Sequence, residues 1–257
     1  MNNSLWLDLI EKNNITPNFL CSLEYFQKSD WKEASDGDYV GVYDVDDLPT
    51  LPLINIKKGI LHQHVPPLGI WADVPGFEPY EFVNKSFWDY QFIYNSLNFQ
   101  NMNGKQWSVF RKNSRKFFRN NQQMDIIETK IGSIDQLEDF SYQAIETIKD
   151  NSIHDIDTMI NFLMNGRHRQ FIIDKSKKKL LAVNIWDENY KYINYRYCLC
   201  LDLPYLSEFA RIKFYKFIAL IRPGKLVNDG GVLGRQSLKS FKDKMNPVEI
   251  RKIYTWK

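Results

Sequence analysis

The sequence is poor in the features that mark disulfide-rich, membrane and secreted proteins. It has three cysteines, Cys21, Cys198 and Cys200, an odd number without metal-ligand spacing, which argues against a disulfide framework. Cys198 and Cys200 alternate on one predicted strand, where we expect them to pack in the core. No stretch approaches the roughly 18 apolar residues of a membrane span, and the N-terminus lacks the pattern of a signal peptide. We therefore expect a soluble cytoplasmic protein.

An excess of charge of one sign is also missing. Lys and Arg total 34 and Asp and Glu total 31, which gives a formal net charge of +3 over 257 residues. Because bulk charge is nearly neutral, nucleic-acid binding has to be argued from local clusters. The chain is 44% hydrophobic and 15% aromatic, which excludes a disordered protein. Its length allows one large or two small domains.

The first third of the sequence consists of short segments separated by turn residues. We predict a helix over 5–12, a second helix starting near Thr16 and Pro17, and a strand over 41–45. Residues 48–56 are apolar but contain two prolines, which suits an edge strand or an extended loop. Further on, many aromatic residues lie among turn residues, and we place them on loops, including Phe87, Trp88 and Tyr90.

A basic amphipathic helix is predicted over 105–120, because apolar side chains recur at spacings of three and four residues from Trp107 to Phe117. Its other face carries cations that have no acidic partner four residues away. This face is either solvated or a docking stripe for the phosphates of a nucleic acid or of a nucleotide-bearing donor. The cations are Arg111, Lys112, Arg115, Lys116 and Arg119.

The chain from residue 124 onward shows a regular order of predicted elements. A strand at 125–130 precedes helices at 133–149 and 155–165. Three antiparallel strands follow at 169–174, 180–187 and 190–201. A long helix at 208–220, a strand at 225–228, a short helix at 237–244 and a last strand at 249–256 complete the order.

This order resembles the GNAT acyltransferase fold, an α+β mixed sheet flanked by helices. The segment 226–231 (Leu-Val-Asn-Asp-Gly-Gly), then Phe241-Lys242 and Asn246-Pro247, look like the C-terminal domain family of bacterial phosphatidylglycerol lysyltransferases. Members of that family carry two tandem GNAT-like units. The resemblance therefore implies a GNAT-like acyltransferase domain over 124–257, and an incomplete GNAT-like or irregular α/β unit over 1–123.

The resemblance also implies where an acyl donor would lie. Two neighbouring parallel strands part in this fold, and here they would be 190–201 and 225–228. The phosphates of coenzyme A would bind at the start of the long helix, near Ser207. However, the glycine-containing signature of that loop is missing, and Pro204 offers no N–H. Because lysyltransferase-type relatives use aminoacyl-tRNA, the donor substrate is either aminoacyl-tRNA or acyl-CoA, with no permanently bound cofactor.

Candidate catalytic residues lie within these two strands or directly after them. Asp229 is either a base that accepts a proton from an attacking amine or hydroxyl, or a turn residue in Asp-Gly-Gly. Asn228 either orients a carbonyl or caps the turn. Arg196 faces either the cleft or solvent, and strand alternation would place Tyr195 and Tyr197 together on the opposite face.

Further polar residues have weaker signals. Lys239 and Lys242, three positions apart on the last helix, either hold a phosphate or carboxylate or face solvent. His62 and His64 have no third ligand nearby in the sequence, so we expect no metal site.

The prediction from these patterns is an enzyme that transfers an acyl or aminoacyl group from an activated donor to an amine or hydroxyl acceptor. One alternative is a nucleic-acid-binding or nucleic-acid-modifying protein, acting on tRNA or DNA through the basic helix and exposed aromatics. Phage DNA base modification is an example of that class. The other alternative is a catalytically inactive GNAT-like scaffold, which the missing phosphate loop favours.

Overall fold

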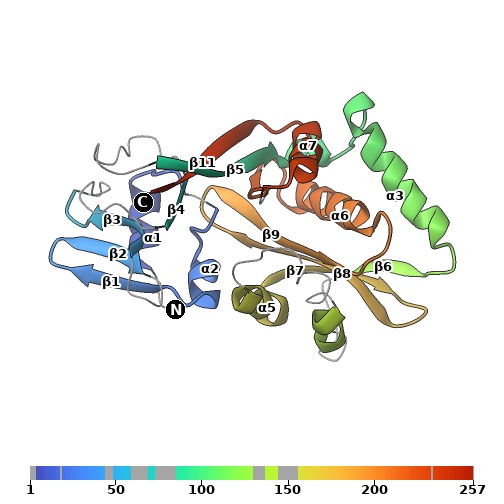
Figure 1. The fold of residues 1–257 in the computed structure, drawn as a ribbon, viewed down its shortest axis with the longest axis horizontal. Helices are drawn as coiled ribbons and strands as arrows, with labels where there is room; N and C mark the ends of the chain where they lie inside the picture. The colour runs from blue at the N-terminus through green and yellow to red at the C-terminus, as the bar shows by residue number, and fades with distance from the viewer. Residues whose placement is uncertain are drawn as a thin grey trace.

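The computed structural model describes residues 4–17, 19–43, 49–58, 69–72, 85–129, 137–143, 156–232 and 234–256. These residues form a three-stranded sheet and an eight-stranded sheet. Helices cover both faces of the larger sheet, as Figure 1 shows.

The N-terminal part combines two short helices with the small antiparallel sheet β1-β2-β3. The predicted edge strand is confirmed as β3, but the helix predicted from Thr16 is wrong. That helix begins only at Leu23, because the Ser22 hydroxyl caps it by accepting a hydrogen bond from the Tyr25 N–H at 3.0 Å. The elements are α1 (Leu5–Lys12), α2 (Leu23–Lys28), β1 (Lys32–Asp36), β2 (Tyr39–Tyr43) and β3 (Pro49–Asn55).

The larger sheet has the strand order β4-β11-β5-β10-β9-β8-β7-β6. It is mixed, because β10 pairs in parallel with β9 and antiparallel with β5. This confirms the predicted α+β architecture, a mixed sheet flanked by helices. The sheet takes strands from both sides of residue 123, and the division into domains at that residue stays a prediction. The strands are β4 (Gly69–Ala72), β5 (Lys85–Asn95), β6 (Ile126–Thr129), β7 (His168–Asp174), β8 (Lys179–Glu188), β9 (Tyr192–Cys200), β10 (Leu226–Asn228) and β11 (Glu249–Trp256).

Strand β5 corrects the placement of the aromatic residues on loops. Phe87, Trp88 and Tyr90 lie on this eleven-residue strand, which pairs with β11 on one side and β10 on the other. Phe92 is fully buried in it. Residues 91–94 are all buried, whereas Phe87 is 50% exposed. A stretch buried on both faces lacks the polar–apolar alternation of a half-exposed strand, so periodicity alone does not reveal it.

The helices divide between the two faces of the large sheet. Helix α6 packs on β8 and β9, and α3 packs on α6, whereas α5 and α2 contact β8 from the other face (Figure 1). The basic helix is confirmed, and residues 137–143 are helical within the predicted 133–149. The rest of that prediction, and His62 and His64, lie outside the described residues. The remaining elements are η1 (Ser96–Phe99), η2 (Lys105–Trp107), α3 (Ser108–Asn120), α5 (Ile156–Asn165), α6 (Leu206–Ile221) and α7 (Gln236–Lys244).

Candidate functional site

Strands β9 and β10 are adjacent, parallel and then part, as predicted. Their pairing covers three residues of each strand and ends at Asn228 opposite Asn194, whereas β9 continues to Cys200. Beyond Asn228 the chain follows β5, because the Asp229 N–H donates to the Phe92 carbonyl at 2.9 Å. This side of β9 therefore has no strand partner past Asn194 among the described residues.

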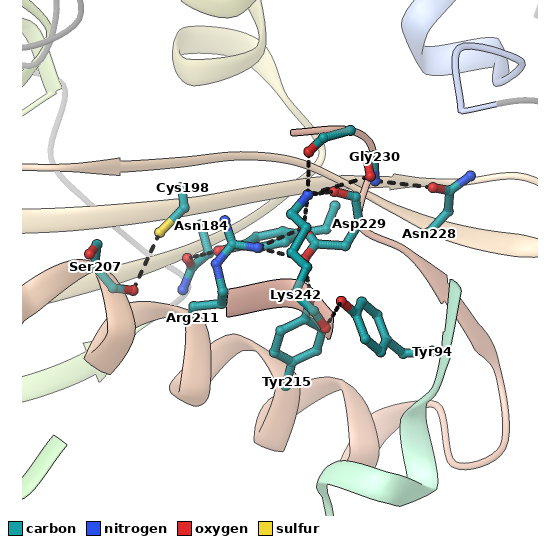
Figure 2. Close-up of polar contacts among 12 residues, drawn as sticks. Tyr94, Asn184, Cys198, Ser207, Arg211, Tyr215, Asn228, Asp229, Gly230 and Lys242 are labelled. Carbon is teal, nitrogen blue, oxygen red and sulfur yellow. Dashed lines mark hydrogen bonds and ion pairs between the residues drawn. The ribbon is translucent and has the colours of Figure 1, made fainter. Parts of the chain in front are cut away.

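A buried ion pair lies where the two strands part. Nη1 of Arg211, from α6, donates to both carboxylate oxygens of Asp229, at 2.7 and 2.6 Å. The Tyr215 hydroxyl, one helical turn further along α6, donates to Asp229 Oδ2 at 2.6 Å. The Asp229 side chain is 2% exposed and that of Arg211 is 16% exposed. Asp229 is thus held by two side chains of α6, Arg211 and Tyr215 (Figure 2).

Lys242 of α7 completes this cluster beside the turn that follows β10. Its Nζ lies 3.6 Å from Asp229 Oδ1, donates to the Gly231 carbonyl at 2.6 Å, and also donates to the backbone carbonyl of Asp229. The pKa of Lys242 is lowered to about 8, mainly by burial and also by Arg211, while Asp229 opposes the change. The solvated helix face considered for Lys242 is therefore wrong, since its side chain is 3% exposed.

The turn after β10 fixes the position of Asp229. The Asn228 side chain accepts from the Gly230 N–H at 3.0 Å and donates to Gln91 at 2.9 Å. Asn228 thus caps the turn, which is one of its two predicted roles. Gly230 has φ +59°, and a Cβ on Gly231 would lie 2.0 Å from a carboxylate oxygen of Asp89. The turn therefore requires glycine at both positions.

Arg196 lies on the other face of the sheet, away from the Asp229 cluster. A β-bulge leaves it unpaired between Tyr195 and Tyr197, which pair with Trp186 and Ile185. The extra residue shifts the alternation, so Tyr195 faces α6 and Tyr197 faces α5. The prediction that these tyrosines share a face is wrong.

The side chain of Arg196 is buried in an ion pair rather than directed to solvent. Its Nε donates to Asp187 at 2.6 Å, and both side chains are at most 1% exposed. The guanidinium lies between the rings of Phe19 and Tyr25, 4.4 and 4.6 Å from their centroids. These contacts join the N-terminal part to the sheet, which is a structural role.

The cations of the basic helix separate into two groups. Arg111 donates through Nη1 to the carbonyls of Met102 and Gly104, and thereby holds the preceding loop. Lys116 donates to the Tyr205 hydroxyl at 3.2 Å, which connects α3 to the start of α6. The second group is exposed and consists of Lys112, Arg115 and Arg119. For these three cations the phosphate-docking stripe stays a prediction.

The start of α6 has the unusual loop that the sequence indicated. Its N-cap is Tyr205, with φ 67° and no side-chain cap. The Ser207 hydroxyl donates to Glu208 at 3.2 Å. A carboxylate in the first turn occupies the positive end of the helix dipole, where it opposes a bound phosphate.

Lys239 lies apart from the buried cluster. Its Nζ pairs with Asp243 at 2.8 Å and lies 5.2 Å from the centre of the Tyr90 ring. The structure thus brings together Asp229, Asn228 and Lys242, and separates Lys239 and Arg196 from them. The sequence analysis missed Arg211 and Tyr215, whose signal was two polar residues four positions apart within an apolar helix.

No protein-family model and no curated protein matches this chain. Its fold is nevertheless found in solved structures. A conserved protein of unknown function from Bacteroides thetaiotaomicron has a TM-score of 0.66 and 14% identity, over 99% of this chain and 92% of that chain. L-PGS from Bacillus licheniformis has a TM-score of 0.60 and 12% identity, over 98% and 90% of the two chains.

A third structure carries the name that the sequence pattern suggested. It is the C-terminal domain of an Agrobacterium fabrum protein described as a lysylphosphatidylglycerol synthetase, with a TM-score of 0.54 and 9% identity, over 98% of this chain and 90% of that chain. The predicted resemblance to this domain family is confirmed as a shared fold.

Two further observations concern the described residues only. They contain no group of three or more His, Cys, Asp or Glu side chains placed to hold a metal ion. None of their helices combines the length and apolar character that crossing a lipid bilayer requires.

Proposed function

We propose that this chain transfers an aminoacyl group from aminoacyl-tRNA to an amine or hydroxyl acceptor. The observation that carries this proposal is the Arg211–Asp229–Lys242 cluster, placed where β9 loses its parallel neighbour. The unpaired edge of β9 offers backbone N–H and C=O groups to an extended donor, as a sheet edge does in strand addition. The partly exposed guanidinium of Arg211 lies beside that edge, 4.9 Å from the ring of Tyr195.

Arg211 is suited to stabilise the negative charge that develops on the donor carbonyl. Its Nη1 is occupied by Asp229, whereas Nε and Nη2 make no hydrogen bond to another described residue. When the acceptor nitrogen or oxygen attacks the ester carbon, these groups can donate to the oxyanion. The ester bond to the ribose then breaks, and the ribose oxygen takes up a proton in place of the one that the acceptor loses. A preorganised donor of this kind contributes about 3 kcal/mol.

Asp229 is better suited to position these cations than to accept a proton. Its two oxygens already accept three hydrogen bonds, two from Arg211 and one from Tyr215. Because a carboxylate bound in this way has little acceptor capacity left, we assign it the orientation of Arg211 and Lys242.

The start of α6 supports tRNA rather than coenzyme A as the carrier of the donor. Pro204 lacks an N–H, Glu208 opposes phosphate in the first turn, and no glycine allows close approach of the backbone. The exposed cations of α3, the helix packed on α6, are placed to contact a polynucleotide backbone. The fold shared with L-PGS agrees with this choice.

Those exposed cations also suit a protein that binds a nucleic acid without transferring anything. The decisive assay supplies tRNA charged with labelled amino acids, together with a lipid extract and a mixture of small amines and hydroxyl compounds. We expect acceptor-dependent loss of label from the tRNA, reduced about 100-fold or more by Arg211→Gln.

The matched control is Arg222→Gln, because Arg222 lies at the far end of the same helix and is 48% exposed. This variant should transfer like the wild type. Binding of tRNA without transfer to any acceptor would favour the nucleic-acid-binding alternative. Acetyl transfer from acetyl-CoA, or an unchanged rate in Arg211→Gln, would refute the proposal.

A further inference from the structure

Two thiols lie side by side on the part of β9 that has no parallel partner strand among the described residues. The sulfur atoms of Cys198 and Cys200 are 3.6 Å apart. Both residues are half-buried on the α6 side of β9, and Cys198 Sγ lies 3.9 Å from the Ser207 carbonyl at the start of α6. This close pair of half-buried cysteines differs from Cys21, which is buried elsewhere in the N-terminal part.

The surroundings make the two thiols chemically unequal. The pKa of Cys198 is lowered to about 7, mainly by the contact with Cys200 and also by the Arg211 guanidinium, whereas burial raises it. Asp229, which faces Cys198 from the end of β10, also raises this pKa. The same contact raises the pKa of Cys200, and Glu208 of α6 adds to that rise. One thiol therefore carries thiolate character at neutral pH while its neighbour stays protonated, the combination typical of a peroxide-reactive pair.

We propose that Cys198 and Cys200 form a modification site that a peroxide oxidises to a disulfide. The Cys198 thiolate attacks the peroxide oxygen, the O–O bond breaks, and Cys198 becomes a sulfenic acid while the peroxide leaves as an alcohol or water after protonation. The Cys200 sulfur then attacks the Cys198 sulfur, and the sulfenic oxygen leaves as water with the Cys200 proton. Both cysteines are oxidised by one peroxide molecule.

Closing this bond requires a local distortion of β9. Alternate residues of a strand have Cα atoms about 6.6 Å apart, near the upper limit for a disulfide, and their Cβ atoms lie about as far apart, beyond the roughly 4.5 Å that a disulfide spans. The bond therefore strains β9, and a strained disulfide is readily reduced by a thiol. The expected consequence, which rests on the proposed function, is that this distortion of the β9 edge weakens donor binding.

The test is exposure of the full chain to hydrogen peroxide, followed by intact mass measurement and thiol counting. Wild type should lose two hydrogens and two free thiols, and dithiothreitol should restore both. Cys200→Ser should instead gain one oxygen that dimedone traps, whereas Cys198→Ser should react at least about tenfold more slowly. The control Cys21→Ser should behave like wild type.

Phenylarsine oxide gives a second measurement that needs no oxidant. Its arsenic bridges two neighbouring thiols with loss of one water, so one equivalent should bind to wild type and none to either single variant. Equal peroxide reactivity in wild type and Cys198→Ser, or arsenical binding that survives both substitutions, would overturn the assignment.

The link to function is tested separately by comparing aminoacyl-tRNA binding before and after oxidation. Unchanged binding would overturn the expected effect of the disulfide on donor binding. These outcomes are distinct from failure of the transfer proposal, which is tested on reduced protein with Arg211→Gln.

Discussion

The buried lysine on α7 gives a quantitative test of the electrostatics of the candidate site. Burial is the main cause that lowers the pKa of Lys242 from 10.5 to about 8. A lowering of this size corresponds to a cost of about 3 kcal/mol for keeping the folded lysine charged. Between these pH values the folded state binds fewer protons than the unfolded state. The cost is therefore fully present below pH 8 and is relieved as the pH rises toward 10.5.

The measurable part of this effect lies between about pH 7 and pH 9. Over that range Lys242 alone should raise the free energy of unfolding by about 1 kcal/mol, measured by urea unfolding at each pH. Lys242→Met removes the titrating group, so the difference between wild type and this variant isolates its contribution. Cys198 titrates in the same range with the same sign, but it is present in both proteins and cancels.

The control for this experiment is Lys239→Met on the same helix. Lys239 is paired with Asp243 at the surface, with 28% of its side chain exposed, so its removal should leave the pH dependence unchanged. If Lys242→Met shows the same rise as wild type, Lys242 does not titrate in this range and the argument is refuted.

Further predictions concern the buried Arg196–Asp187 ion pair and the cations of α3. Arg196→Met and Asp187→Asn should each lower the free energy of unfolding by about 3 to 5 kcal/mol, because each leaves a buried charge without its partner. A decrease below about 1 kcal/mol in urea unfolding would contradict this. The double variant Arg115→Gln/Arg119→Gln should weaken tRNA binding at unchanged stability, and the salt dependence of binding should fall by the equivalent of about two phosphate contacts. Arg111→Gln should instead lower the melting temperature, because the carbonyls of Met102 and Gly104 lose their hydrogen-bond donor. Unchanged affinity of the double variant at several salt concentrations would show that the outer face of α3 is only solvated.

Features with local physical causes were predictable from the sequence. Helix α3 follows from apolar side chains at helical spacing, and the hairpin of β7 and β8 follows from apolar runs around a charged turn. The order of elements from β7 to β11 resembled the GNAT fold, and this resemblance implied the mixed sheet with parallel β9 and β10. The signals for the helix and the hairpin depend on residues a few positions apart, so they survive without knowledge of the tertiary structure.

Features that depend on a distant neighbour were not predictable. The bulge at Arg196 depends on how β8 and β9 align, because only the partner strand decides which residue is left over. The burial of β5 depends on strands that come more than 100 residues later in the chain, β10 and β11. Its aromatic residues therefore resembled a loop region next to turn residues.

The candidate site shows the same division. The sequence by itself nominated Asp229 and Lys242, from a strand end followed by two glycines and from the pattern of the C-terminal segment. Only the tertiary structure brought Arg211 to Asp229, because the ion pair requires α6 to pack across β9 while the end of β10 follows β5. It also decided that Lys242 is buried rather than solvated. A charge can be buried only where opposite charge and backbone carbonyls surround it, and here these groups come from α6, from α7 and from the turn after β10.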